Sequence, residues 1–498
     1  MILHIIVTLK EAKRKWYDSN VHRVNTKDKR VIALRIAAYI ATVVLSIITT
    51  TLLLFVALGY RFNSQDGIIQ SGLLLIDNKP EAGAIYIDGE LNDNQTPGRF
   101  VLPVSTYEVS LERDGYRGWK KNFSIKAEVV ERVDYPLLIP KELSTNTLAA
   151  IGTPAMVSQS LDNKQLVSFV DGESVLRRTV LDPATPETTD VSLSSAFARQ
   201  AGSIGSLRVI EWSLDNNFIL VEQSLPGGQK NIISLELDKP GEAVNLTKLF
   251  SAISLGDPHY VGGETDEIYA LSDANLRRLN IKSAEATVVL EQVKSYVPYG
   301  DKTIAFSRLS DDSLTLEAGL LRDSTSTVLQ RYTDTQSNIM VTYGQYDGHD
   351  YFVSSDKKAV NIYRDPLKRP ILATQIPFVS LPFDSAQYIK FSPNSQFILL
   401  QSGKNYITYD LEHKRQSTFT IEQDIIGLHP RWMNDSHLSY QTTDGVNYLT
   451  EFDNQNSNKM VVSDVGTRLY YAANQRGAYR IVTGANGTQL ELVSLTAE

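Results

Sequence analysis

A short phrase recurs between residue 150 and the end of the chain: a small polar turn followed by a compact apolar strand. It reads SLDNKQLVSF from Ser160, SLDNNFILVE from Ser213, SPNSQFILLQ from Ser392 and MNDSHLSYQ from Met433. The first two copies lie 53 residues apart, the last two lie 41 apart, and the 179 residues between the middle two hold four periods of about 45. Periods of ~40–50 residues with several strands each are typical of a β-propeller, in which one repeat forms one blade.

A second apolar run follows each phrase, at Val175–Val180, Ile232–Leu237, Tyr406–Leu411 and Tyr448–Phe452. Residues 150–498 hold about eight such periods, so the sequence predicts a propeller of seven or eight blades. A series of β-sandwiches is the alternative, but it does not account for the regular spacing. We interpret Ser144 to Ala150 as a short linker before the first blade.

The phrase and the Tyr-x-x-Asp or Leu-x-Leu-Asp run behind it resemble the TolB-type and WD40-like propeller repeats. The Trp-Asp dipeptide and the Gly-His pair of true WD40 repeats are missing. The resemblance implies a rigid ring with a central channel and loop-lined faces, used mainly for protein or ligand binding.

An uncharged stretch of 25 residues runs from Ile36 to Tyr60. As a helix it is roughly 37 Å long, enough to cross a hydrocarbon core of ~30 Å. A buried core helix is rarely this long, and a cleaved signal peptide fits poorly because the apolar run is too long and no A-x-A site follows. We therefore predict an uncleaved transmembrane helix at residues 36–60, which makes the membrane a partner of the chain.

The charge is divided unevenly on either side of this stretch. Residues 1–35 carry nine Lys or Arg and three Asp or Glu, a net charge of +6, which leaves −14 for the other 463 residues. Because basic flanks stay in the cytoplasm, residues 1–35 are predicted to be a cytoplasmic basic tail and everything after the helix to be extracytoplasmic. The expected location is the plasma membrane, crossed once.

Residues 72–141 alternate apolar and polar positions between turn formers such as Asp88-Gly89, which is typical of a small antiparallel β-sandwich. The order of Pro80-Glu81-Ala82-Gly83-Ala84, Ile85-Tyr86-Ile87-Asp88-Gly89, Thr96-Pro97 and Asp114-Gly115-Tyr116 resembles the PEGA domain. The extra Ala82 departs from that pattern, as does Val104-Ser105, which stands where a glycine is usual. The resemblance implies a spacer or interaction module of bacterial or archaeal envelope proteins, not an enzyme.

Several kinds of chemistry are excluded by composition. The 498 residues include no cysteine, which rules out disulfides, iron–sulfur ligation and thiol nucleophiles. The net charge of −8 argues against a nucleic-acid binder. The sequence contains no H-E-x-x-H zinc motif, G-x-S-x-G nucleophile elbow or phosphate loop. We therefore expect no catalytic residues, no metal site and no cofactor.

One stretch, from Tyr343 to Tyr351, concentrates side chains that bind ligands elsewhere. Around its glycines stand Tyr346, Asp347, His349 and Asp350, a set suited to a sugar-stacking or cation-binding loop. These four are our candidate binding residues. The alternative interpretation is a blade-connecting turn flanked by strand tyrosines.

The sequence thus predicts a mainly β protein with an N-terminal transmembrane helix, a PEGA-like sandwich at residues 72–141 and a propeller at residues 150–498. The expected function is that of a non-enzymatic envelope scaffold whose propeller binds a protein or glycan. One alternative is a membrane-tethered carbohydrate-active enzyme using two carboxylates about 5–10 Å apart in the propeller. Another is a purely structural spacer.

Overall fold

The computed structural model describes residues 26–57, 60–63, 67–181, 186–200, 202–368, 376–427, 429–485 and 487–497. Most of the predicted basic tail lies outside these residues. The chain divides into two compact units, one made of Met1–Leu111 and Lys120–Pro136, the other of Glu112–Trp119 and Leu137–Glu498.

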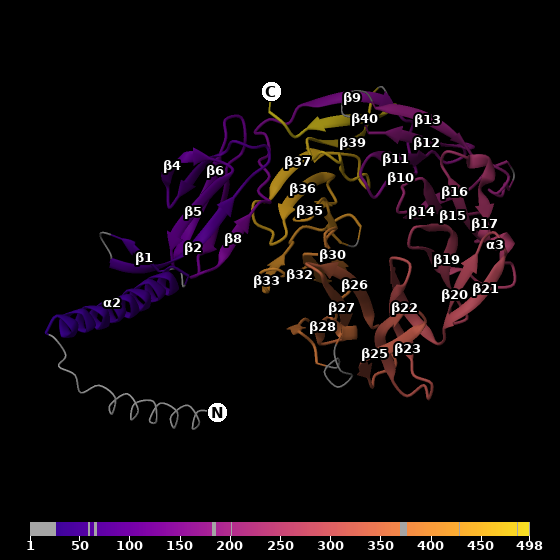
Figure 1. Ribbon diagram of the computed structural model, residues 1–498. Coiled ribbons are helices and arrows are strands. Elements are labelled where there is room, and N and C mark those ends of the chain that lie inside the picture. Colours follow the sequence, from indigo (N-terminus) through magenta and orange to yellow (C-terminus); the bar gives the residue numbers. More distant parts are fainter. Residues whose placement is uncertain are drawn as a thin grey trace. The chain divides into compact units, whose positions relative to one another are not determined.

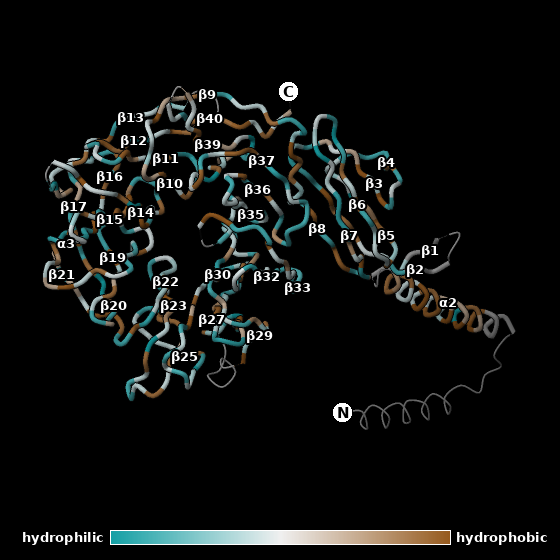
Figure 2. The backbone as a smooth tube through the Cα atoms, turned by 180° about the vertical axis from the view of Figure 1, so that it is seen from behind, coloured by the Kyte–Doolittle hydropathy of each residue, from teal (hydrophilic) through white to brown (hydrophobic). Residues whose placement is uncertain are grey.

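Helix α2 spans Thr26–Ala57, and its segment Val31–Phe55 is long and apolar enough to cross a membrane. Figure 2 shows this helix as an almost continuous hydrophobic stretch. Its described side chains are exposed, so no protein core accounts for their apolar character. The hydroxyl of Thr42 donates to the carbonyl of Ala38 at 2.9 Å, which satisfies that polar group inside the helix. Tyr60, predicted to be helical, begins strand β1 instead, and the described part of the helix ends at Ala57.

The segment after the helix forms two four-stranded sheets, ordered β1-β2-β5 with β8 beside β2, and β4-β3-β6-β7. All described pairs in them are antiparallel except β2 with β8, which is parallel. Burial alternates along β5, β7 and β8, as expected for strands with one face in a core. The strands are β1 Tyr60–Asn63, β2 Gly67–Ile76, β3 Ala84–Ile87, β4 Glu90–Gln95, β5 Gly98–Pro103, β6 Thr106–Glu112, β7 Trp119–Ser124 and β8 Val130–Val133.

Turn chemistry explains the sequence landmarks of this sandwich. Asp88 and Gly89 join β3 to β4 with φ angles of 51° and 82°, a turn that requires residues tolerating positive φ. The Asp88 carboxylate also accepts the backbone N–H of Glu108 at 2.8 Å. A Cβ added at Gly98 would lie 2.6 Å from the side chain of Ile85, so the close packing of the sheets needs glycine there. The inserted Ala82 has a φ of 68°, uncommon for a residue with a Cβ.

Within the described residues, the second unit contains eight four-stranded sheets arranged as a ring, so the propeller has eight blades (Figure 1). The first strands of successive sheets contact one another, as β10 does β14 and β22 does β26, so these strands form the inner wall. The strands of the first four blades are β10 Met156–Gln159, β11 Gln165–Phe169, β12 Val175–Val180, β13 Glu187–Ser192, β14 Ser206–Trp212, β15 Phe218–Ser224, β16 Lys230–Glu236, β17 Val244–Asn245, β18 Gly256–Val261, β19 Glu264–Ser272, β20 Asn275–Asn280, β21 Glu285–Leu290, β22 Val293–Tyr299, β23 Thr303–Leu309, β24 Leu316–Arg322 and β25 Thr325–Tyr332.

The other four blades are built in the same way, except that the last blade includes strand β9, which comes before β10 in the chain. Three short helices lie in connections between strands of the propeller: η1 Pro240–Glu242, α3 Leu246–Leu249 and η2 Pro366–Lys368. The strands are β26 Met340–Tyr346, β27 His349–Ser355, β28 Ala359–Arg364, β29 Val379–Pro382, β30 Tyr388–Phe391, β31 Phe397–Ser402, β32 Asn405–Asp410, β33 Arg415–Thr420, β34 Arg431–Trp432, β35 His437–Gln441, β36 Val446–Glu451, β37 Asn458–Val462, β38 Tyr470–Tyr471, β39 Gly477–Gly484, β40 Gly487–Ser494 and β9 Thr145–Ala150.

The ring is closed by strand β9, which pairs antiparallel with β40 and completes the last blade. The interpretation of Ser144 to Ala150 as a linker is therefore wrong for β9. The segment TNTLAA carries no clear alternation, because it is the outer strand of its sheet, with most side chains exposed. Its partner is hundreds of residues away, so the sequence around it gives no sign of the pairing.

The core of the propeller is divided among the junctions between neighbouring sheets. Within the described residues, eight clusters of buried apolar side chains lie there, each drawing on two adjacent blades. One cluster, for example, joins Val167 and Phe169 of the first blade to Ile219 and Ile233 of the second. A longer chain can therefore add blades to such a ring without enlarging any single core.

The recurring sequence phrase is a hydrogen-bonded turn. At its first copy the Ser160 hydroxyl donates to Asp162 at 2.6 Å and accepts the backbone N–H of Gln165 at 3.1 Å. Asn163 adopts a φ of 58°, as asparagine tolerates. Ser213 and Ser392 build the same turn between the first and second strands of their blades, whereas Ser310 builds it between the second and third. The phrase thus marks a kind of turn and not one place in the blade.

Closure through β9 can be tested with a disulfide, because the chain has no other cysteine. Ala150 lies opposite Gln489 in the β9–β40 register. We expect the Ala150→Cys/Gln489→Cys double variant to form an intramolecular disulfide on oxidation. By closing a loop of 339 residues it should stabilise the propeller by about 5 kcal/mol at most, measured by denaturation with and without reductant. The Ala150→Cys single variant is the control, and absence of the intramolecular crosslink would contradict the assigned closure.

Candidate functional site

The four predicted binding residues share one hairpin, formed by β26 and β27 in the fifth blade. Tyr346 ends β26 and lies opposite His349, which begins β27. Asp347 and Gly348 form the turn between them, with φ angles of 48° and 71°. The alternative interpretation is right that this is a turn flanked by strand tyrosines, but the turn joins two strands of one sheet and does not connect two blades.

Asp350 is buried and holds the fourth and fifth blades together. Its carboxylate lies 3.3 Å from a guanidinium nitrogen of Arg322, the last residue of β24, and accepts a hydrogen bond from Gln345 at 2.8 Å. Arg322 also donates to the Tyr343 hydroxyl at 2.7 Å. Burial alone raises a carboxyl pKa, but hydrogen bonds from Tyr343 and Gln345 and the charge of Arg322 outweigh it, so the pKa of Asp350 is lowered.

The other members of the hairpin have different partners. His349 contacts Asp365 through Nδ1 at 2.5 Å and contacts Arg364 through Nε2. The Tyr346 hydroxyl donates to Glu412 at 2.7 Å, whereas Asp347 is exposed. The four residues are therefore close in space as well as in sequence, but the side chains of Tyr346, His349 and Asp350 have different partners. Their role in binding stays a prediction.

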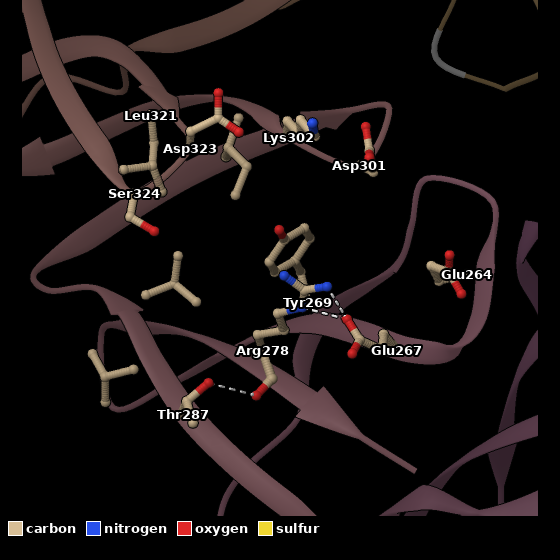
Figure 3. A pocket seen from close by; sticks show the side chains of 13 residues that line it. Glu264, Glu267, Tyr269, Arg278, Thr287, Asp301, Lys302, Leu321, Asp323 and Ser324 are labelled. Carbon is tan, nitrogen blue, oxygen red and sulfur yellow. Dashed lines mark hydrogen bonds and ion pairs between the residues drawn. The ribbon is translucent and has the colours of Figure 1, made fainter. Parts of the chain in front are cut away.

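A groove with a volume of about 830 Å³ lies between the third and fourth blades (Figure 3). Glu264 and Glu267 line it from the third blade, and Asp301 and Asp323 from turns of the fourth. Glu267 is ion-paired to Arg278, as the dashed lines in Figure 3 show. Lys302 lines the groove as well, so its four carboxylates face two cations, Arg278 and Lys302, and the groove is acidic on balance.

A second, smaller pocket of about 210 Å³ lies at the inner strands of the first, seventh and eighth blades. Arg431 and Trp432 of β34 line it, together with Arg468 and Tyr471 from the segment containing β38. The guanidinium carbon of Arg468 lies 5.4 Å from the centre of the Tyr470 ring. Sequence reasoning missed this pocket, because its residues come from separate blades and form no motif.

Metal binding finds no support in the side-chain geometry of the described residues. Within the ranges that the structure covers, no group of three or more His, Asp or Glu side chains is arranged to hold an ion. The chemistry available in both pockets is therefore that of charged and aromatic side chains.

Comparisons with known proteins gave one family match and several structural similarities. Residues 71–139 match the PEGA domain, which confirms the resemblance drawn from the landmarks. No curated protein sequence matches the chain. Solved structures similar to 71% of the chain include the C-terminal WD40 domain of Sif2 (98% of that chain, 11% identity, TM-score 0.46) and BamB from Moraxella catarrhalis (99%, 10%, 0.40). An oligogalacturonate lyase from Vibrio parahaemolyticus is similar over the same 71% (99% of that chain, 9% identity, TM-score 0.37).

Substituting the two aspartates of the hairpin separates their roles. We expect Asp350→Asn to lower the free energy of unfolding by about 3 kcal/mol, because Arg322 then lacks its buried counter-charge. The same change at exposed Asp347 should cost about 0.5 kcal/mol or less. The measurement is urea denaturation of both variants near pH 7.

The pH dependence provides a second readout. A folded-state pKa below the unfolded value stabilises the protein above the unfolded pKa, and this contribution is lost as the pH falls through the folded pKa. The gap in stability between the wild type and Asp350→Asn should therefore close in acid. Equal effects of the two substitutions at neutral pH would contradict the assigned network.

Proposed function

We propose that this protein is a single-pass envelope protein that holds its propeller outside the cytoplasm, where the propeller binds a protein or glycan partner without catalysis. The anchor would be the apolar segment Val31–Phe55 of α2. The net charge of +6 on residues 1–35 favours a cytoplasmic N-terminus, because positive flanks are retained on that side. The remaining net charge of −14 fits an exported domain that is not drawn to anionic lipid.

The ion pairs and hydrogen bonds of the carboxyl groups are the observation that carries the non-enzymatic part of the proposal. A glycosidase-type general acid needs a raised pKa so that it holds its proton near neutral pH. Among the described residues, every carboxyl group with a shifted pKa has it lowered: Glu222, Asp266, Asp312, Asp334, Asp350, Asp365, Asp424 and Asp444. Such groups stay ionised and are suited to ion pairs and turns.

Buried carboxylates in the blades illustrate this use. Glu317 of β24 is nearly inaccessible and pairs with Arg308 at 2.9 Å and Arg331 at 3.0 Å. These contacts link three neighbouring strands of one blade. The acids of the propeller therefore reinforce a rigid frame, which is what a binding scaffold requires.

The topology can be tested with single cysteines in the cysteine-free chain. We expect Ser326→Cys, at an exposed position of β25, to react with a membrane-impermeant maleimide on spheroplasts. Ser19→Cys, in the basic tail, should react only after lysis. Labelling of Ser19→Cys but not of Ser326→Cys in intact spheroplasts would reverse the orientation.

A carbohydrate-active enzyme is the second candidate, and the acidic groove of Figure 3 is the observation that favours it. Glu264, Asp301 and Asp323 would supply the carboxylate pair. We expect the full-length protein in detergent to release no new reducing ends from neutral or uronate-containing polysaccharides. Release by the wild type that is lost in the Asp301→Asn/Asp323→Asn variant would instead establish the enzymatic role.

A further inference from the structure

The pocket at the inner strands holds two arginines from different blades. Arg431 begins β34, and Arg468 lies two residues before β38. Both line the same volume of about 210 Å³. Lys390 of the neighbouring inner strand β30 is exposed as well, so three consecutive blades carry a cation on or beside the inner wall.

Neither arginine has a counter-charge in the part of the chain that the structure describes. Arg431 and Arg468 form no ion pair there, whereas Arg308 and Arg322 do. Elsewhere on the inner wall a charge is balanced: His259 of β18 lies 3.2 Å from Glu211 of β14. Although burial lowers the pKa of this histidine, its hydrogen bonds to Asp257 and Glu211 raise it to about 9. The two arginines thus lack the balancing charge that His259 has.

The pocket also strengthens the effect of these charges. Burial, and then the positive charge of Arg431, lower the pKa of Arg468 to about 10. Arg468 is largely desolvated and Arg431 is exposed; the two cations repel, and an anion placed between them relieves that repulsion. Because the charge of Arg468 is less screened than a surface charge, the acidic exterior does not cancel the attraction.

The remaining lining selects the kind of anion. The Trp432 ring lines the pocket, while its indole N–H is buried and has no hydrogen-bond partner. Gln159 donates through Nε2 to the Tyr471 carbonyl, and Ser439 bonds the Tyr471 hydroxyl, so both have partners within the propeller. Leu161, Pro393, Met433 and Leu469 supply apolar walls. Guanidinium donors next to apolar walls suit a carboxylate on an aliphatic stem.

We propose that this pocket binds an acidic side chain of a peptide segment from a partner protein, held by Arg431 and Arg468 beside the Trp432 ring. The inference rests on the binding role proposed above and names the chemistry of the partner. A volume of about 210 Å³ is small for a polysaccharide site but sufficient for one anchoring side chain. Bidentate guanidinium–carboxylate contacts beside a tryptophan are typical of interface hot spots.

The test uses the full-length protein in nonionic detergent and a fluorescein-labelled peptide with three Glu-Leu repeats. We expect the peptide to bind, measured by fluorescence anisotropy, and its Gln-Leu counterpart to bind at least tenfold more weakly. Arg431→Gln/Arg468→Gln should lose at least tenfold in affinity. Arg431→Gln alone, at an exposed residue, should give a smaller loss without threatening the fold.

The matched control is Arg208→Gln/Lys230→Gln, which removes the same charge from the exposed pair around Glu222. Its affinity should equal that of the wild type. No binding at millimolar peptide, equal binding of the Gln-Leu peptide, or unchanged binding by the pocket variant would overturn the inference. Binding of an oligouronate in place of the peptide would also overturn it, in favour of a glycan ligand.

Crosslinking in the native cell distinguishes an error in the pocket assignment from an error in the proposed binding function. If the wild type captures no stoichiometric partner, the binding role itself is wrong. If the wild type and Arg431→Gln/Arg468→Gln capture the same partner equally, only the pocket assignment is wrong. A partner lost in the pocket variant but kept in Arg208→Gln/Lys230→Gln supports both.

Discussion

The pairing of β9 with β40 is the constraint on which the propeller depends. Each blade has two apolar faces, and both are covered only when the sheets form a closed ring. Leu148 and Ala149 of β9 pack in the cluster shared by the last and first blades, beside Leu166 and Leu490. Without this strand the ring would open at one junction and expose apolar surface to water. Because the chain contains no cysteine, strand pairing and packing alone close it.

The fold could be predicted wherever it depends on local chemistry. Serine-centred turns at Ser160, Ser213 and Ser392 are local, so they revealed the period, and Asp88-Gly89 revealed a hairpin of the sandwich. Two features of the fold could not be predicted from the sequence. Strand β9 is defined by a partner at the far end of the chain. Ser310 uses the repeated turn in a second place within its blade, so the turn by itself does not show where a blade begins.

The candidate site was predictable only in part. Local composition drew attention to the hairpin of Tyr346, His349 and Asp350, and the structure shows that these side chains have partners within the propeller. Arg431 and Arg468 were not found, because each is an isolated arginine in an ordinary strand context. Only the ring brings their blades together at one pocket. Composition finds residues that are close in sequence, whereas a propeller assembles its inner wall from residues that are far apart.

Rigidity connects the ion pairs of the blades to the inner pocket. Ion pairs such as Asp350 with Arg322 and Glu317 with Arg308 hold neighbouring strands together. The carboxylates in these pairs are therefore not available to pair with other arginines. The closed ring fixes the strands that carry Arg431 and Arg468, so both residues line one pocket in the folded protein. A ligand therefore meets the two arginines already brought to the same place, although the exposed Arg431 side chain still has to be ordered on binding. The stability of the frame and the affinity of the proposed site therefore have the same physical origin.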